Sequence, residues 1–221
     1  MSSHLRSNRR RRVSPEMVER KATRRRELLD AADQAIRSSG PDVTMEEIAA
    51  RARTAKPVLY RYFGDKGGLY QALAERYVQL VMATVAEALG DPATDPPRRR
   101  LEAAIDAYLR LVEEQSEIYR FLMHRAVTER AEAHATVTDF IQGLGGRLAA
   151  VLAEDLRSRG LDAHAAEPWA RGIVGMVQVA GDWWLEQKSM TRERLVEHLV
   201  MLLWTGLRDQ ADSATEAPRP A

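Results

Sequence analysis

Hydrophobic residues recur at intervals of three and four along most of this chain, which is the period of an amphipathic α-helix. Leu69, Leu73 and Tyr77, for example, share one face of such a helix. The pattern predicts an all-α fold. The expected helices cover about residues 17 or 19 to 38, 45–52, 56–63, 66–89, 98–114, 117–127, 131–158, 163–187 and 191–207.

Glycine and proline mark the ends of several of these helices. Gly40 precedes a proline after the first helix, and Gly64 follows the third, where glycine readily takes the left-handed conformation that closes a helix. The clearest break is 90–97, whose three prolines and one glycine cannot continue a helix. Glycine inside a helix costs about 1 kcal/mol relative to alanine. We therefore expect an interruption of the 131–158 helix, as a kink or a close approach of another group, at Gly143, Gly145 and Gly146.

The stretch 43–70 has the pattern of two short helices joined by a tight turn. Thr44 is followed three residues later by Glu47, which is the capping-box signature of a helix start. In the second helix Leu59 and Phe63 lie four residues apart and face inward, while the other sides are basic and tyrosine-rich. This pattern predicts a helix-turn-helix with a recognition helix. The alternative that the spacing leaves open is a helical hairpin with a solvated basic face.

The amino-acid sequence of this stretch resembles the DNA-binding domain of the tetracycline-repressor (TetR) family over about residues 24–76. The family's recognition helix commonly ends in Leu-Tyr-x-(Tyr/His)-Phe, followed by a short loop with lysine. Residues 59–63 and Lys66 match that pattern, and 44–49 match the family's second helix. The chain departs from the family at Arg53, Thr54 and Ala55, where a glycine, a β-branched apolar residue and a serine are usual. The missing serine is the usual N-cap, and we expect Thr54 to replace it.

The resemblance implies a head that reads the major groove of double-stranded DNA. Arg61 is the side chain best suited to a bidentate guanine contact. For each tyrosine of this helix the alternative is partial burial within the head. The base-facing residues implied by the resemblance are Thr54, Lys56, Pro57, Val58 and Arg61, and the phosphate contacts are Thr44, Tyr60, Tyr62 and Lys66.

Charge is distributed unevenly along the chain. Residues 1–66 hold 16 Lys+Arg and 9 Asp+Glu, a net +7, whereas the remainder holds 17 and 23, a net −6. A basic part joined to an acidic part is typical of a DNA-binding domain on a separate body. We expect a disordered basic arm over 1–18 that adds phosphate contacts, with a solvated tail as the alternative. The DNA-binding domain is expected over 19–66, a helical ligand-binding and dimerisation body over 67–209, and a disordered tail over 210–221.

The last two expected helices are apolar on more than one face. A single copy of the chain can cover only one face of each, so the other would leave a large exposed apolar patch. Pairing with a second copy would cover it, which predicts a homodimer that presents two recognition helices to a palindromic operator. The expected anchors are Trp169, Trp183, Trp184, Leu199, Leu203 and Trp204.

Apolar residues of the body also predict a pocket for a small apolar effector. Ordinary core packing is the alternative for each of them. Residues 56–60 and the tryptophan-rich carboxyl end look similar to family members that govern lipid metabolism, which implies an acyl chain or a fatty acyl-CoA. The expected effector contacts are Tyr108, Val112, Tyr119, Phe121, Leu122, Met123, Phe140, Ile141, Leu144, Met176 and Trp183.

Chemistry typical of enzymes is missing from the sequence. There is no cysteine, no metal-binding spacing among the five histidines, and no Walker, Rossmann or GxSxG motif. We expect no enzymatic activity, cofactor or metal. No apolar run approaches the roughly 18 residues needed to span a bilayer, and no signal peptide is evident, so a cytoplasmic protein is expected.

The predicted function is a ligand-responsive transcriptional repressor that its effector releases from the operator. Two alternatives stay open: a constitutive architectural DNA-binding protein without a ligand, and an enzyme of unrecognised type.

Overall fold

The computed structural model describes residues 14–91, 94–126 and 131–216, with side chains described except at 124–126, 131–134, 136, 137, 140 and 206–216. All regular structure in these residues is helical, which confirms the all-α prediction. The elements are α1 (Pro15–Ser39), α2 (Met45–Arg51), α3 (Lys56–Phe63), α4 (Lys66–Ala88), α5 (Pro97–Glu114), α6 (Ser116–Arg120), a π-helix η1 (Phe121–Ala126), α8 (Ala131–Ser158), a short 3-10 helix η2 (Ala163–Ala165), α9 (Ala166–Gln187) and α10 (Arg192–Glu216).

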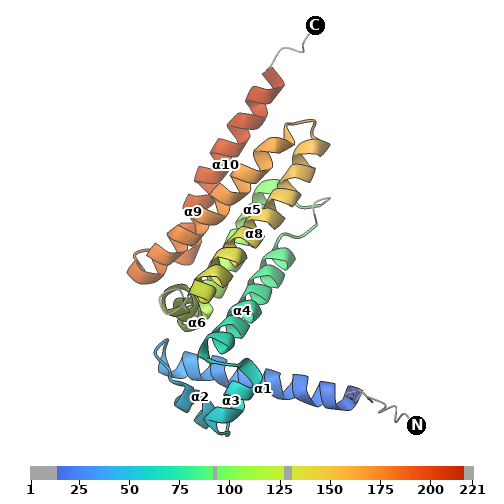
Figure 1. Cartoon of the computed structure of the whole chain (residues 1–221). Helices are drawn as coiled ribbons and strands as arrows, with labels where there is room; N and C mark the ends of the chain where they lie inside the picture. The colour runs from blue at the N-terminus through green and yellow to red at the C-terminus, as the bar shows by residue number, and fades with distance from the viewer. Residues whose placement is uncertain (1–13, 92–93, 127–130, 217–221) are drawn as a thin grey trace, which may run out of the picture.

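The helices form a small head and an elongated body (Figure 1). The head consists of α1, α2 and α3, with α2 and α3 on the side of α1 that faces away from the body. Helix α4 begins beside α3 and runs into the body, so it belongs to both parts. In the body α5 contacts both α4 and α10, and α8 lies against α9.

A shared apolar core holds the three head helices together. Ile36 of α1, Ile48 of α2 and Leu59 of α3 have no exposed surface. The predicted capping box is present: the Thr44 hydroxyl accepts from the Glu47 N–H at 3.3 Å, and the Thr44 N–H donates to the Glu47 carboxylate at 2.7 Å. These contacts fix the start of α2 and its packing against α3.

The turn between α2 and α3 differs in detail from the prediction. Arg53 occupies the left-handed region at φ 48°, in place of the glycine that the resemblance led us to expect. A residue with a Cβ pays about 1–2 kcal/mol for that conformation. The N-cap of α3 is Ala55, without a side-chain hydrogen bond, so the expectation that Thr54 caps the helix is wrong. Pro57 in the first turn lowers the need for a cap because it has no N–H to satisfy.

Two helices of the body also depart from their predicted form. Residues 117–127 were expected as one helix, but α6 changes at Phe121 into the π-helix η1, and Val127 lies outside the described residues. Isolated π-helical turns are frequent at functional sites. Helix α8 is continuous through Gly143, Gly145 and Gly146, so these glycines do not divide it into two helices. A Cβ at Gly145 would meet Arg171 Cγ at 3.5 Å, an ordinary contact, and one at Gly143 would meet nothing within 4 Å.

The two ends of the described chain are more helical than expected. Helix α1 begins at Pro15, with the Ser14 hydroxyl accepting from the Met17 N–H, so 15–18 are helical rather than part of a disordered arm. Helix α10 continues to Glu216, so 210–216 are helical rather than a disordered tail. Residues 1–13 and 217–221 lie outside the described residues.

Candidate DNA interface and ligand pocket

Helix α3 presents a basic, aromatic surface at the end of the molecule farthest from the body (Figure 1). Pro57, Tyr60 and Arg61 are exposed on it. The Arg61 guanidinium lies 5.5 Å from the centre of the Tyr62 ring and has no carboxylate partner among the described residues. This charge is therefore available to an external partner such as a base edge or a phosphate.

Lys56, the other cation of α3, is already paired within the head. Its ammonium group forms an ion pair with Glu46 of α2 and lies 5.8 Å from the centre of the Tyr60 ring. The hydrogen bond from Lys56 lowers the pKa of the Glu46 carboxyl, and the same bond raises the pKa of Lys56. Both groups stay charged at neutral pH, so a DNA contact from Lys56 has to compete with Glu46.

The remaining residues expected to contact DNA are less accessible. Thr44 is exposed, but its hydroxyl belongs to the capping box. Thr54 is half-buried, and Val58 and Tyr62 pack against the head core. Lys66 is half-buried, with its ammonium 5.1 Å from an aromatic ring centre. The structure thus gives Tyr62 the partial burial that was the alternative for the tyrosines, and it leaves Tyr60 and Arg61 outermost.

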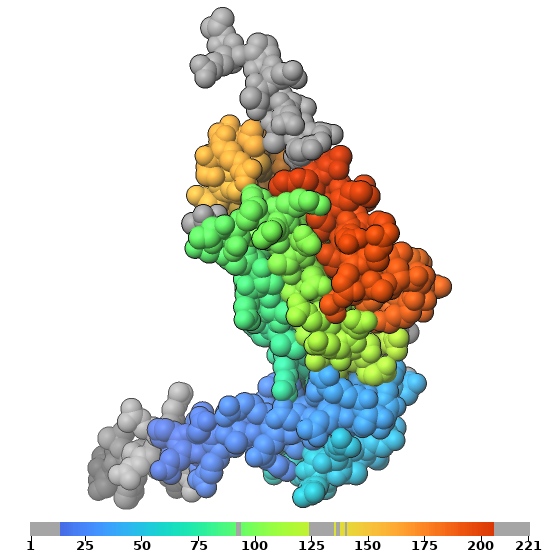
Figure 2. Space-filling model, turned by 180° about the vertical axis from the view of Figure 1, so that it is seen from behind, coloured from blue at the N-terminus to red at the C-terminus, as the bar shows by residue number. Residues whose placement is uncertain are grey.

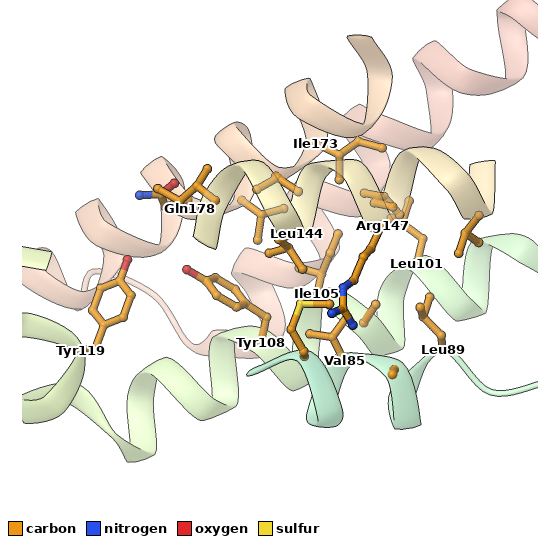
Figure 3. A pocket seen from close by; sticks show the side chains of 18 of the residues that line it. Val85, Leu89, Leu101, Ile105, Tyr108, Tyr119, Leu144, Arg147, Ile173 and Gln178 are labelled. Carbon is orange, nitrogen blue, oxygen red and sulfur yellow. The ribbon is translucent and has the colours of Figure 1, made fainter. Parts of the chain in front are cut away.

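A cavity of about 320 Å³ lies in the body between α4, α5, α8 and α9 (Figure 3). Ligand pockets of proteins typically have volumes of about 300–1,000 Å³. Its lining is mostly aliphatic and aromatic. Five of the residues expected at the effector site line it: Tyr108, Tyr119, Met123, Ile141 and Leu144.

The other residues expected at the effector site lie elsewhere. Val112, Phe121 and Leu122 are buried in the core outside the cavity. Met176 packs against the core from a half-buried position, and Trp183 is 45% exposed. Their positions follow from helical periodicity: Ile173, Val174, Val177 and Gln178 of α9 line the cavity, whereas Met176 and Trp183 of the same helix do not. The side chain of Phe140 lies outside the described residues.

Several lining residues were missed by the sequence argument. Helix α4 contributes Met82, Val85 and Ala86, and Leu89 follows directly after it; their spacing of three and four was the available signal. Nothing in the sequence pattern marked Arg147 of α8, the only charged side chain among the residues found to line the cavity in the described part of the chain.

One end of the cavity carries hydrogen-bonding groups. The Tyr119 hydroxyl donates to the carboxyl group of Asp182. Burial raises the pKa of Tyr108 to about 12 and raises the pKa of Tyr119 far above its ordinary value. Both phenols therefore stay protonated at neutral pH. Gln178 lines the same end (Figure 3).

A short segment links the cavity to the head. Tyr119 and Met123, which line the cavity, flank Phe121 of η1, and the Phe121 ring packs edge-to-face on Tyr70 of α4 with ring centres 4.5 Å apart. At the start of α6, Gln115 accepts a hydrogen bond from Arg37 of α1. A ligand that shifts this segment would therefore also disturb contacts made by α1 and α4.

Other kinds of site find no support in the described part of the chain. No group of three or more histidine, aspartate or glutamate residues there is arranged to hold a metal ion. None of the described helices combines the length and apolar character needed to cross a bilayer.

Comparison with known proteins matched both parts of the molecule. Residues 28–73 match the family model described as "Bacterial regulatory proteins, tetR family", and residues 84–219 match the one described as "Tetracyclin repressor-like, C-terminal domain". Together the two matches cover the head from the middle of α1 onward and nearly the whole body.

Relatives and solved structures agree with these matches. An uncharacterized HTH-type transcriptional regulator of Mycobacterium tuberculosis is 34% identical, over 85% of this chain and 78% of that protein. The HTH-type transcriptional activator FasR of Mycolicibacterium smegmatis is 31% identical over 83% of each chain. A TetR-like regulator from Rhodococcus sp. RHA1 superposes with a TM-score of 0.61 at 28% identity, over 85% of this chain and 97% of that one. FadR of Bacillus subtilis, solved with stearoyl-CoA, superposes at 0.62 with 18% identity, over 80% and 96%.

Proposed function

The chain belongs to the tetracycline-repressor (TetR) family of bacterial transcriptional regulators, and on this basis we propose that a small apolar ligand in the body controls its binding to an operator. Membership of the family confirms the helix-turn-helix regulator and the absence of an enzymatic function that the sequence predicted. The single observation that carries the proposal is the 320 Å³ cavity, which shares α4 and the α6–η1 segment with contacts to the head. A constitutive architectural DNA-binding protein would have no use for such a cavity.

We propose an acyl group as the part of the effector that fills the cavity. The apolar lining suits a hydrocarbon chain. FadR of Bacillus subtilis, which shares the fold, was solved with stearoyl-CoA, and this supports a fatty acyl-CoA as the first effector to test.

The direction of regulation is part of the proposal: the protein represses transcription, and the bound effector lowers its affinity for the operator. Deleting the gene should raise expression from the operator in a reporter strain. A fall in expression would overturn the proposal that the protein is a repressor. Activation is the alternative outcome to look for, because the relative FasR is named a transcriptional activator.

Filling the cavity tests the proposal directly. Replacing Leu144, which lines it, with tryptophan should leave operator binding intact and abolish release by stearoyl-CoA, because the larger side chain occupies the space of the ligand. Fluorescence anisotropy of an operator duplex, identified by selection from random sequences, measures both properties. Leu80→Trp, at an exposed position of α4, is the matched control and should respond like the wild type. Undiminished release of Leu144→Trp would contradict the proposal.

The recognition helix supplies a second test. Regulators of this family bind DNA, and we propose Thr44, Thr54, Lys56, Pro57, Val58, Tyr60, Arg61, Tyr62 and Lys66 as the DNA contacts, with Arg61 as the main base contact. Arg61→Ala should lose about 1–3 kcal/mol on the preferred duplex and relax the sequence preference. Arg61→Lys is the matched control: it keeps the charge without the bidentate geometry, so it should retain binding to random DNA but lose preference. Equal losses on preferred and random DNA for both variants would assign Arg61 to phosphate contact instead.

Regulators of this family form dimers, and we propose the outer faces of α9 and α10 as the interface of this one. The two helices lie along the same side of the body (Figures 1 and 2). Trp184, Leu199 and Leu203, which the sequence suggested as anchors, are buried within a single copy and cannot serve. Large apolar side chains remain exposed on these helices instead: Val179 at 67%, Trp183 at 45%, Met201 at 60% and Leu202 at 63%. A two-fold dimer would present two recognition helices to a palindromic operator. Because bacterial transcriptional regulators bind DNA in the cytoplasm, we propose the cytoplasm as the location.

A further inference from the structure

We propose that the effector is an elongated amphiphile with a negatively charged group at one end, beside Arg147, and a hydroxyl group at the other end, beside Tyr108 and Gln178. This inference rests on the proposed function, because it names the chemistry of the ligand for the same cavity. The inference is more specific than the proposal of an apolar ligand, since two polar positions in the cavity would set the orientation of the ligand and the selectivity of the site.

The charged end is assigned from Arg147. Its side chain extends from α8 across the cavity toward α4 and α5 (Figure 3). No carboxylate within the described part of the chain forms an ion pair with it. Ala86 and Val151, which also line the cavity, are exposed, so Arg147 lies where the cavity opens to solvent. An anion at this opening keeps its hydration and gains charge-assisted hydrogen bonds from the guanidinium.

The hydroxyl end is assigned from the hydrogen-bonding groups at the opposite end of the cavity. Tyr119 donates its one hydroxyl proton to Asp182, so it has no proton left for a ligand. The Tyr108 side chain also lines the cavity, and its hydroxyl can both donate and accept a hydrogen bond. The Gln178 side chain has no hydrogen-bond partner among the described residues. A ligand hydroxyl can donate to Tyr108 and accept from the Gln178 amide at the same time.

The cavity is long enough to hold an elongated ligand. Figure 3 places Tyr108, Tyr119 and Gln178 toward one end and Arg147 with Leu101 toward the other. Along α8 the lining runs from Ile141 to Val151, a length of about 15 Å at 1.5 Å per residue. Between the ends the walls are aliphatic, so the middle of the ligand is a hydrocarbon. A fatty acid and a fatty acyl-CoA both place a negative group at the opening, as a carboxylate or as phosphates.

Calorimetry on the full chain tests the charged end. Dodecanoate should bind roughly tenfold to a hundredfold more tightly than dodecanol to the wild type, as expected for hydrogen bonds to a charged group. Arg147→Gln should remove this difference without weakening dodecanol. The matched control is Arg157→Gln, on the same helix but away from the cavity, which should keep it. Lauroyl-CoA distinguishes the two sources of the anion. If it binds more tightly than dodecanoate and Arg147→Gln removes that advantage, the anion beside Arg147 is a phosphate of the CoA. If it binds more weakly than dodecanoate, the anion is a free carboxylate.

The hydroxyl end is tested with ω-hydroxydodecanoate. It should bind the wild type roughly tenfold more tightly than dodecanoate, and Gln178→Leu and Tyr108→Phe should each reduce that preference several-fold. Tyr77→Phe is the matched control, because Tyr77 is a buried tyrosine that does not line the cavity. Circular dichroism of each variant confirms that it folds.

The outcomes separate this inference from the proposed function. If dodecanol and dodecanoate bind equally and Arg147→Gln changes neither, the inference is overturned, while release of the operator by either compound upholds the proposed function. If no amphiphile binds and none releases the operator, both are overturned. If ω-hydroxydodecanoate and dodecanoate bind equally, while Arg147→Gln still removes the preference for dodecanoate over dodecanol, the assignment of the hydroxyl end is overturned.

Discussion

Leu202→Glu will convert the protein from a dimer to a monomer and remove its binding to a palindromic operator. Leu202 is 63% exposed on α10, so a single folded copy tolerates the change with little strain. In the proposed dimer the same position is covered by the second copy, and burying an unpaired carboxylate there carries a large desolvation penalty. We expect a folded, helical monomer in sedimentation equilibrium at micromolar concentration.

The loss of operator binding follows from the loss of the second recognition helix. One head of this kind contacts one half-site, and joining two heads raises affinity by about 10²–10⁴ through effective concentration. Anisotropy with the full operator should therefore show at least a hundredfold loss, while binding to a single half-site stays close to that of the wild type.

The control for this experiment is Leu80→Glu. Leu80 is 41% exposed on α4 and lies outside α9 and α10. It receives the same chemical change and should remain a dimer with full operator binding. A Leu202→Glu protein that stays dimeric would contradict the proposed interface, and with it the explanation of how two half-sites are engaged.

Trp184→Ala will lower the free energy of unfolding by about 3–5 kcal/mol, the range for deleting a buried aromatic side chain. Trp184 is 1% exposed, and its indole N–H donates to the Met190 backbone carbonyl at 2.8 Å. The Lys188 ammonium lies 4.0 Å from the centre of its ring. The substitution removes the largest fully buried side chain of the described core and opens a cavity between α9 and the start of α10.

Chemical denaturation monitored by circular dichroism measures this effect, at one fixed protein concentration because dimerisation contributes to stability. Trp184→Phe separates packing from hydrogen bonding: it keeps most of the ring and should lose only a part of the stability, including about 1 kcal/mol for the hydrogen bond. A loss below about 1 kcal/mol for Trp184→Ala would show that the surroundings collapse around the deletion, contrary to the packing described here.

Local patterns were sufficient to predict the head. The capping box at Thr44 and the inward pair Leu59 and Phe63 are interactions within one turn of a helix, so their spacing in the sequence determines them. Family resemblance added the direction in which α3 faces. The DNA contacts themselves stay a proposal, since accessibility of Arg61 and Tyr60 is consistent with contact but does not establish it.

Sequence patterns were not sufficient for residues on helices with two apolar sides. Trp183 and Trp184 are neighbours of the same type, yet one is 45% exposed and the other 1% exposed. Successive residues point about 100° apart, so only the position of α10 and of the loop at Met190 decides which one is buried. The same ambiguity explains why Trp184, Leu199 and Leu203 were expected at the dimer interface but are buried within one copy.

By itself the sequence determined the all-α fold, the helix-turn-helix and the family, because each depends on short-range spacing or on a matched motif. Only the tertiary structure decided which residues line the cavity. A cavity is the space left between helices, so its walls depend on how α4 and α9 are rotated against α5 and α8. That rotation places Val85 and Arg147 at the cavity and leaves Val112 and Met176 packed in the core. The apolar pattern of each helix alone cannot specify this rotation.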